Sequence, residues 1–336
     1  IDLEQWSELL KIFCDGLRDY DYYSASCSRD LPSIASMIAS DFHEYWWENY
    51  KFKESRENNK SISITNSSAL KIEISKYLVC KCFDALLDPN NPVEIDALKK
   101  INVDGIITTN WDNFIDQIFP DYKVYIGQDE LLFSKPQEVG EIYKIHGCTS
   151  NPNSLVLTKE DYDLFESKNA YLASKLITLF VEHIIVFIGY SINDAHILKL
   201  LSSIVNCLGD EHIKALQNNL VFVQRSRDGE KSIESTFLQI NKSPIPITIV
   251  KTNDFSEIYN SISGLRRKIP VRLLRHFKEQ LFELIQNNDP NDRLAVLNLE
   301  EIEDNDAIEF VVGIGIKNEL LEKGYSGLSA IDVFKN

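Results

Sequence analysis

Hydrophobic residues recur every three or four positions through the first hundred residues of the chain, a spacing that predicts amphipathic helices. The spacing is clearest at 3–16, 31–52 and 69–87, and Gly16 suits the end of the first helix. The polar run 53–68 predicts a loop between the second and third helices. The N-terminal part of the chain is therefore expected to be mostly helical.

After residue 100 short apolar runs alternate with amphipathic segments. Apolar strands separated by helices are typical of a mostly parallel sheet that is covered on both faces. We therefore expect an α/β, Rossmann-like fold with helices on both faces of the sheet, N-terminal helical elements and a mostly helical C-terminal appendage. The expected strands are 104–109, 123–127, 141–147, 184–189, 219–224 and 245–250.

This pattern divides the 336-residue chain into two regions. Residues 1–263 are expected to form one domain, helical over about 1–100 and sheet-containing over about 101–263. Residues 264–336 begin with a basic amphipathic helix and continue through an acidic run that is typical of a solvated surface. We expect this second region to serve packing or assembly.

The chain has 51 acidic and 35 basic residues, which gives a formal net charge of −16 at pH 7. An acidic surface repels phosphate backbones, so direct nucleic-acid binding is disfavoured. An alternative in which the basic helix 265–288 touches DNA, as part of a nuclease-associated subunit, stays open at this point. No apolar run reaches the length of a membrane span and no signal-peptide pattern opens the sequence, which favours a cytoplasmic protein.

The six cysteines are scattered along the chain and include no Cys-x-x-Cys pair. Zinc sites commonly rest on such pairs, so no metal site is expected. Scattered cysteines in a long chain are typical of free thiols in a reducing cytosol. The cysteines are Cys14, Cys27, Cys80, Cys82, Cys148 and Cys207.

Polar residues follow three of the expected strands directly. Asn110 and Asp112 come after the first strand, His146 ends the third, and Gly189 and Ser191 come at the end of the fourth. Each cluster, taken alone, also fits a structural role such as a helix cap or a tight turn. Because ligands bind at the carboxyl ends of the strands in such sheets, the three clusters together predict one binding site.

The last of these clusters has features of a nucleotide site. Gly189 allows a ligand to approach the backbone closely, and the helix expected after Ser191 offers free N–H groups and the positive end of its dipole. The hydroxyl groups of Thr109 and Ser191 add hydrogen-bonding partners for a phosphate or a ribose. The chain contains no G-x-x-x-x-G-K-[ST] loop and no G-x-G-x-x-G fingerprint, so neither of these phosphate-binding loops contributes.

Together the three clusters resemble the motifs of the sirtuin family. Residues 108–112 (TTNWD) are similar to its Thr-x-Asn-x-Asp segment, and His146-Gly147 is similar to its catalytic His-Gly pair. Residues 187–194 (FIGYSIND) resemble the Gly-Tyr-Ser-x-x-Asp form of bacterial sirtuin-like defence proteins. The order and spacing of the motifs agree over about residues 105–250.

Two departures from the family pattern change what the resemblance implies. The zinc module with two Cys-x-x-Cys pairs is missing, which disfavours deacylation of acyl-lysine peptides. The Gly-Ala-Gly-x-Ser loop, which cradles the NAD+ phosphates in the family, is also absent, and we expect it to lie upstream of Ile1.

The resemblance implies an NAD+ glycohydrolase that cleaves its substrate NAD+ into nicotinamide and ADP-ribose. Nicotinamide leaves as a neutral base, so the reaction needs a positioned water and a stabilised ribosyl cation rather than an acid on the leaving group. Asn110 is expected to hold the ribose or the water, His146 to accept a proton, and Asp112 to orient Asn110 or anchor its loop. The expected dinucleotide-binding residues are Thr108, Thr109, Gly189, Tyr190, Ser191 and Asp194.

The same resemblance implies an effector of bacterial anti-phage defence that acts by depleting NAD+. It implies a homo-oligomer that works with a HerA-type hexameric ATPase or responds to a phage-derived activator. The main alternative is a non-catalytic sensor that binds NAD+ or ADP-ribose in the same pocket and signals through assembly.

Overall fold

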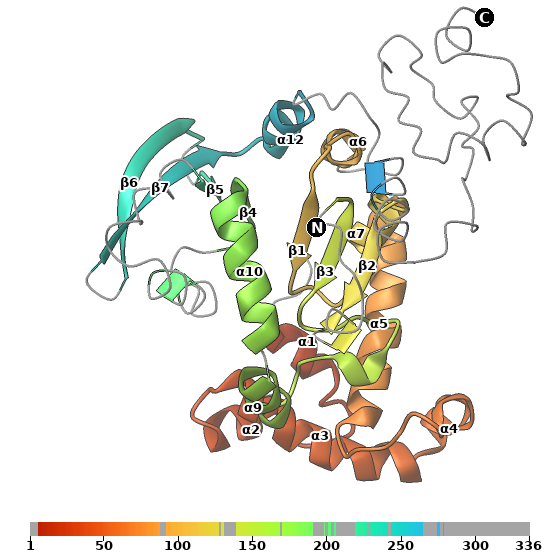
Figure 1. Ribbon diagram of the computed structural model, residues 1–336. Coiled ribbons are helices and arrows are strands. Elements are labelled where there is room, and N and C mark those ends of the chain that lie inside the picture. Colours follow the sequence, from red (N-terminus) through yellow and green to blue (C-terminus); the bar gives the residue numbers. More distant parts are fainter. Residues whose placement is uncertain are drawn as a thin grey trace, which may run out of the picture. The chain divides into compact units, whose positions relative to one another are not determined.

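The computed structural model describes most of the chain up to residue 264 (Figure 1). The described residues belong to one compact unit, Ile1–Gln286. The expected division of the chain at residue 263 stays a prediction. The expected helices at 191–208 and 265–288 lie, apart from isolated positions, outside the described residues. Described are 6–87, 92–127, 129–130, 139–168, 170–190, 198, 201–202, 205, 219–226, 229–240, 243–264, 274–275 and 278.

The N-terminal part is helical, as predicted (Figure 1). The expected loop at 53–68 is wrong in part, because α4 begins at Lys53. This stretch lacks an apolar stripe, but its Lys, Glu and Arg residues are good helix formers, and the Arg56 guanidinium donates a hydrogen bond of 2.8 Å to the Asn49 carbonyl. The elements are α1 (Trp6–Ile12), α2 (Tyr20–Ser26), α3 (Leu31–Glu48), the 3-10 helix η1 (Tyr50–Phe52), α4 (Lys53–Asn59), α5 (Ser68–Leu87) and α6 (Pro92–Lys99).

Helix α3 is the centre of this layer. Its N-cap is Asp30, whose carboxylate accepts a hydrogen bond of 3.1 Å from the Ser33 backbone N–H. One face of α3 packs in a core that also contains residues of α5, and the same core includes Leu155 and Leu157 from the segment after His146. The helical layer therefore packs against the segment that follows His146, one of the expected site residues. The buried residues of α3 are Ile34, Ala35, Ile38, Ala39, Phe42 and Trp46.

In the part of the chain that the structure describes, seven strands form two hydrogen-bonded sheets, which Figure 1 shows. The first sheet is wholly parallel, in the order β1-β3-β2, and the second has the order β4-β5-β7-β6, with β4, β5 and β7 parallel. Strand β6 pairs antiparallel with β7. The strands are β1 (Gly105–Thr108), β2 (Lys123–Ile126), β3 (Glu141–Lys144), β4 (Ile185–Ile188), β5 (Leu220–Arg225), β6 (Ser232–Ile240) and β7 (Ser243–Thr252).

The predicted α/β class and all six predicted strands are confirmed. Strand β6 was not predicted, and its environment explains why. It lies at the edge of its sheet, and the large apolar side chains of Ile233 and Phe237 are 77% and 69% exposed. A strand that is held by backbone pairing at an edge carries little of the burial pattern on which sequence-based prediction relies.

Helix α10 (Ala170–Glu182) connects the two sheets. Leu172, Leu176 and Leu179 pack with aromatic residues of β2 and β3, while Phe180 packs with Phe187 of β4. The remaining described helices are α7 (Phe114–Ile118), α9 (Lys159–Lys168), α12 (Phe255–Ser263) and the 3-10 helix η2 (Pro152–Ser154).

Within the residues that the structure describes, no helix combines the length and the hydrophobicity needed to cross a membrane.

Cysteines in the described parts of the chain are all free thiols. Cys80 is exposed on α5, whereas Cys82 and Cys148 are buried. Cys14 is half-buried after α1, and burial, assisted by the negative charge of Asp19, raises its pKa to about 11. The thiols therefore differ in exposure, and the raised pKa of Cys14 disfavours its reactive thiolate.

We expect Cys80 to react with a maleimide at pH 8 much faster than Cys14 in the folded protein. Only about 0.1% of a thiol with a pKa three units above the pH is ionised, and the thiolate is the nucleophile. Mass-spectrometric peptide mapping of a labelling time course measures each site separately. The unfolded chain is the control, in which both cysteines should react at similar rates, and equal rates in the folded protein would contradict the expectation.

Candidate functional site

The carboxyl ends of β1 and β3 lie side by side. Thr108 and Lys144, the last residues of the two strands, are register partners, and the Ile145 N–H donates a hydrogen bond of 3.0 Å to the Thr108 carbonyl. Asn110 and His146 each follow two residues beyond this pair. The parallel register therefore brings together the backbone segments that carry the two expected catalytic residues.

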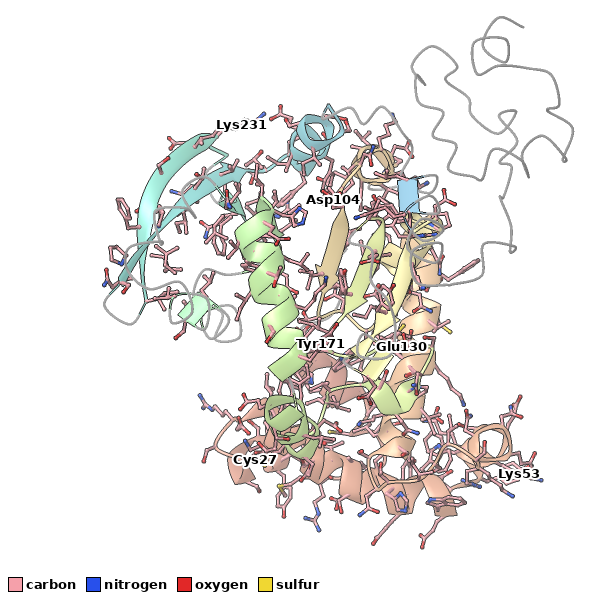
Figure 2. The ribbon with its side chains drawn as sticks, viewed as in Figure 1. Cys27, Lys53, Asp104, Glu130, Tyr171 and Lys231 are labelled. Atoms are coloured by element: carbon pink, nitrogen blue, oxygen red, sulfur yellow. The ribbon has the colours of Figure 1, made fainter. Side chains whose placement is uncertain are left out.

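Figure 2 shows which end of the first sheet this is. Glu130 lies beyond the carboxyl end of β2, where its carboxylate accepts a hydrogen bond of 2.7 Å from the Ile126 N–H. Asp104 lies at the opposite end, immediately before β1. The expected site belongs to the Glu130 end, as the rule for ligand sites in parallel sheets requires.

The loops after β1 and β3 are hydrogen-bonded to each other. The Thr149 N–H donates to the Trp111 carbonyl over 2.8 Å. The Asn113 side-chain oxygen accepts from the Cys148 thiol over 2.9 Å and from the Thr149 hydroxyl over 3.2 Å. The loop after β1 is thus fixed relative to the loop that carries His146.

Asp112 anchors the first of these loops. Its side chain is 6% exposed, and one carboxylate oxygen accepts a hydrogen bond of 2.8 Å from the Phe114 N–H at the start of α7. This is the helix-start role that the residue type allows by itself. Asn110, in contrast, is exposed, and its N–H donates to the Thr108 hydroxyl over 3.0 Å. The arrangement assigns anchoring to Asp112 and leaves the Asn110 amide accessible to a ligand.

His146 is held by aromatic side chains. It is 6% exposed, and its ring lies edge-to-face against Tyr162 and Phe165, with centroid distances of 5.7 and 5.1 Å. Such contacts favour a defined ring orientation. Tyr162 also contacts Trp6, which lies edge-to-face with Trp111, so α1 and the loop after β1 adjoin this aromatic cluster.

The helix that carries Tyr162 and Phe165 is fixed at its start by a reciprocal cap. The Asp161 carboxylate accepts a hydrogen bond of 2.8 Å from the Thr158 N–H, and the Thr158 hydroxyl accepts one of 3.3 Å from the Asp161 N–H. The buried ammonium of Lys71 in α5 lies 2.6 Å from the same carboxylate. The helical layer thus determines where α9 presents its aromatic side chains to His146.

The third strand end is joined to the first. Gly189 has a φ of +82°, and a Cβ at this position would meet no atom of the described residues within 4 Å, so they leave the backbone open to close approach. The next residue, Tyr190, places its hydroxyl 2.9 Å from the Thr109 hydroxyl and accepts a hydrogen bond of 3.2 Å from the Thr109 N–H. Ser191 and Asp194 lie outside the described residues.

The structure thus brings six of the nine expected site residues into two linked groups. Thr108, Asn110, Asp112 and His146 lie at the paired ends of β1 and β3, and Tyr190 reaches Thr109 from the end of β4. Gly189 is the seventh described residue and adjoins Tyr190. The catalytic and binding roles of these residues remain predictions.

A charged cluster that the sequence did not predict lies beneath the loops. Lys144 is fully buried, and its ammonium lies 3.2 Å from the Asp116 carboxylate. Burial raises the pKa of Asp116, and the positive charge of Lys144 opposes that shift. A lysine inside the apolar strand sequence "EIYKIHG" is the signal that could have pointed to this cluster.

In the described parts of the chain, no group of three His, Cys, Asp or Glu side chains is placed to bind a metal ion. An exposed amide, a buried imidazole and an open glycine backbone can instead orient a sugar or a water and accept a proton.

Comparison with known proteins gives a consistent result. A family model described as SIR2-like domain matches residues 104–244. NAD(+) hydrolase ThsA of Enterococcus faecium is 25% identical over 187 residues, which are 51% of this chain and 39% of that protein. NAD(+) hydrolase ThsA of Cytobacillus dafuensis is 28% identical over 132 residues, 38% of this chain and 26% of that protein. Defense-associated sirtuin 2 of Bacillus subtilis is 28% identical over 133 residues, 37% of this chain and 13% of that protein.

The chain therefore spans between 13% and 39% of the length of these three relatives. The family match begins at Asp104, just before β1, and ends at Pro244 in β7. It includes all three strand ends described above. Residues 104–244 of this chain are therefore similar to a SIR2-like domain.

Proposed function

We propose that this SIR2-like domain hydrolyses the bond between nicotinamide and ribose in NAD+, releasing nicotinamide and ADP-ribose. The observation that carries the proposal is the pairing of β1 with β3, which places Asn110 and His146 two residues beyond the partners Thr108 and Lys144. Relatives named NAD(+) hydrolase support the choice of substrate.

In this proposal no general acid is needed to protonate the leaving group, because nicotinamide departs as a neutral base. The Asn110 amide holds the ribose or the attacking water. His146 accepts a proton from that water, and the aromatic contacts of Tyr162 and Phe165 limit the motion of its ring. Asp112 acts indirectly, by anchoring the loop on which Asn110 lies.

The dinucleotide is proposed to extend from these residues toward the end of β4. The open backbone at Gly189 and the polar groups of Thr108, Thr109, Tyr190, Ser191 and Asp194 would bind its ribose and phosphate groups.

At the level of the cell, we propose an anti-phage effector that depletes cytoplasmic NAD+, in keeping with the relative named Defense-associated sirtuin 2. A homo-oligomer, together with a HerA-type ATPase or a phage-derived activator, is the proposed setting in which the activity is switched on. Residues 264–336 are proposed to serve that assembly.

The test is to incubate the full chain with NAD+, alone and together with its proposed partner, and to follow nicotinamide release by chromatography. Stoichiometric formation of nicotinamide and ADP-ribose is the expected result. Tight binding of unchanged NAD+ under both conditions would overturn hydrolysis and favour the sensor.

A further inference from the structure

We infer that Lys144 is a positioning residue that sets the distance between the loop of Asn110 and the loop of His146. The expected effect on the rate of nicotinamide release rests on the proposed function. The expected effect on the two loops rests only on the contacts that Lys144 makes. Lys144 is fully buried, so we assign it a positioning role and not a catalytic one.

The ammonium of Lys144 joins three separate segments. It donates to the Asp112 carbonyl in the loop after β1, and to the Cys148 sulfur, 3.4 Å away, in the loop after β3. The third contact is the ion pair of 3.2 Å with Asp116 in α7. An ammonium has three N–H donors, and the described surroundings supply three acceptors.

The two loop contacts are placed symmetrically with respect to the site. Asp112 lies two residues beyond Asn110, and Cys148 lies two residues beyond His146. One buried group therefore holds both loops at equivalent points. A displacement of about 1 Å in such a geometry costs on the order of 100-fold in rate.

Structural stability alone gives a weak reason for a charge at this position. Removing an ammonium from water is costly, and a well-packed apolar pair of similar volume is often as stable as a buried ion pair. A Met at position 144 with a neutral amide at position 116 would fill the space. Such a pair would lack the donor that holds the Asp112 carbonyl and the Cys148 sulfur.

The decisive variant is therefore Lys144→Met combined with Asp116→Asn in the full chain. We expect its melting temperature to exceed that of Lys144→Met alone, because no buried charge is left without a partner. We nevertheless expect the Thr149 and Phe114 amides to exchange hydrogen about tenfold faster than in the wild type, roughly the effect of losing one hydrogen bond. We expect kcat for nicotinamide release to fall about 100-fold, with KM changed less than about threefold.

The matched control is Lys251→Met combined with Glu234→Gln. This pair links β7 to β6 with a distance of 3.0 Å and is about half exposed. The control removes the same two charges and should leave hydrogen exchange at Thr149 and Phe114 unchanged.

Hydrogen exchange at the wild-type rate at Thr149 and Phe114 in the Lys144→Met, Asp116→Asn variant would overturn the inference. A kcat that returns to the wild-type value together with the melting temperature would overturn it as well. If that variant does not fold, Cys148→Ala serves instead, because it removes one acceptor of the Lys144 ammonium, together with the thiol's own hydrogen bond to Asn113, and leaves the ion pair in place. Unchanged exchange over residues 145–151 in Cys148→Ala would then contradict the inference. Because exchange requires no NAD+ cleavage, a wild-type chain that releases no nicotinamide would refute the proposed function without deciding the role of Lys144.

Discussion

Replacing His146 by alanine is expected to lower the rate of nicotinamide release from NAD+ about 10²- to 10⁴-fold, the usual effect of removing a positioned general base. Replacing Asn110 by alanine should produce a loss of similar size, because the ribose or the attacking water would no longer be oriented. Both reactions are measured by chromatography under conditions in which the wild-type chain is active. Asn110 is exposed, so its replacement should leave the free energy of unfolding nearly unchanged.

Two control substitutions replace a histidine and an asparagine that lie at the amino ends of strands, opposite the carboxyl ends that carry the expected site. His183 lies just before β4, 3.7 Å from Asp104, and Asn219 lies just before β5, where it donates to the Val181 carbonyl over 3.3 Å. His183→Ala and Asn219→Ala should retain the wild-type rate. Full activity in folded His146→Ala and Asn110→Ala proteins would refute the roles assigned to these residues.

The sequence predicts those helices and strands that bury an apolar face, because burial produces a regular hydrophobic pattern. The apolar runs that became β1 to β5 and β7 pack on helices, and the apolar stripe of α10 packs against both sheets. Two of the elements that were missed are held by other means. Strand β6 depends on pairing with β7 at a sheet edge, and α4 depends on helix propensity and on the hydrogen bonds of Arg56.

The convergence of the site residues was predictable for a geometric reason. Parallel strands end at a common edge, so polar residues that follow them must lie near one another. The position of Asn110 and His146 beyond the paired residues Thr108 and Lys144 follows from this rule. No comparable rule states which side chain will bridge two loops.

The cross-links of the site therefore escaped prediction. The contact between the Tyr190 and Thr109 hydroxyl groups, which links the two sheets, was not predicted, and the expected role of Tyr190 in binding the dinucleotide stays a prediction. Lys144 and Cys148 showed no pattern of spacing, because their partners are 32 and 35 positions distant in sequence. Contacts of this kind depend on the packed arrangement of loops, which hydrophobic periodicity does not encode.

Replacing Gly147 by alanine is expected to destabilise the protein by about 3–5 kcal/mol and to abolish nicotinamide release. Gly147 has a φ of +92°, which is strained for any residue with a side chain. An alanine Cβ would also lie 2.2 Å from the Ser154 carbonyl oxygen and 2.8 Å from the Leu155 nitrogen, so the backbone of η2 would have to move. His146 directly precedes this position, and its carbonyl accepts the Val156 N–H over 3.0 Å, so that movement would displace the imidazole.

The control for this substitution is Gly127→Ala, at the end of β2. Gly127 also has a positive φ, +67°, but its Cβ would meet no atom of the described residues within 4 Å. Its replacement should therefore cost only about 1–2 kcal/mol, the price of the left-handed conformation. Urea unfolding of both variants isolates the steric part of the effect, because the two glycines share the conformational part. Equal losses of stability would mean that the close approach between Gly147 and Ser154 does not constrain the loop that carries His146.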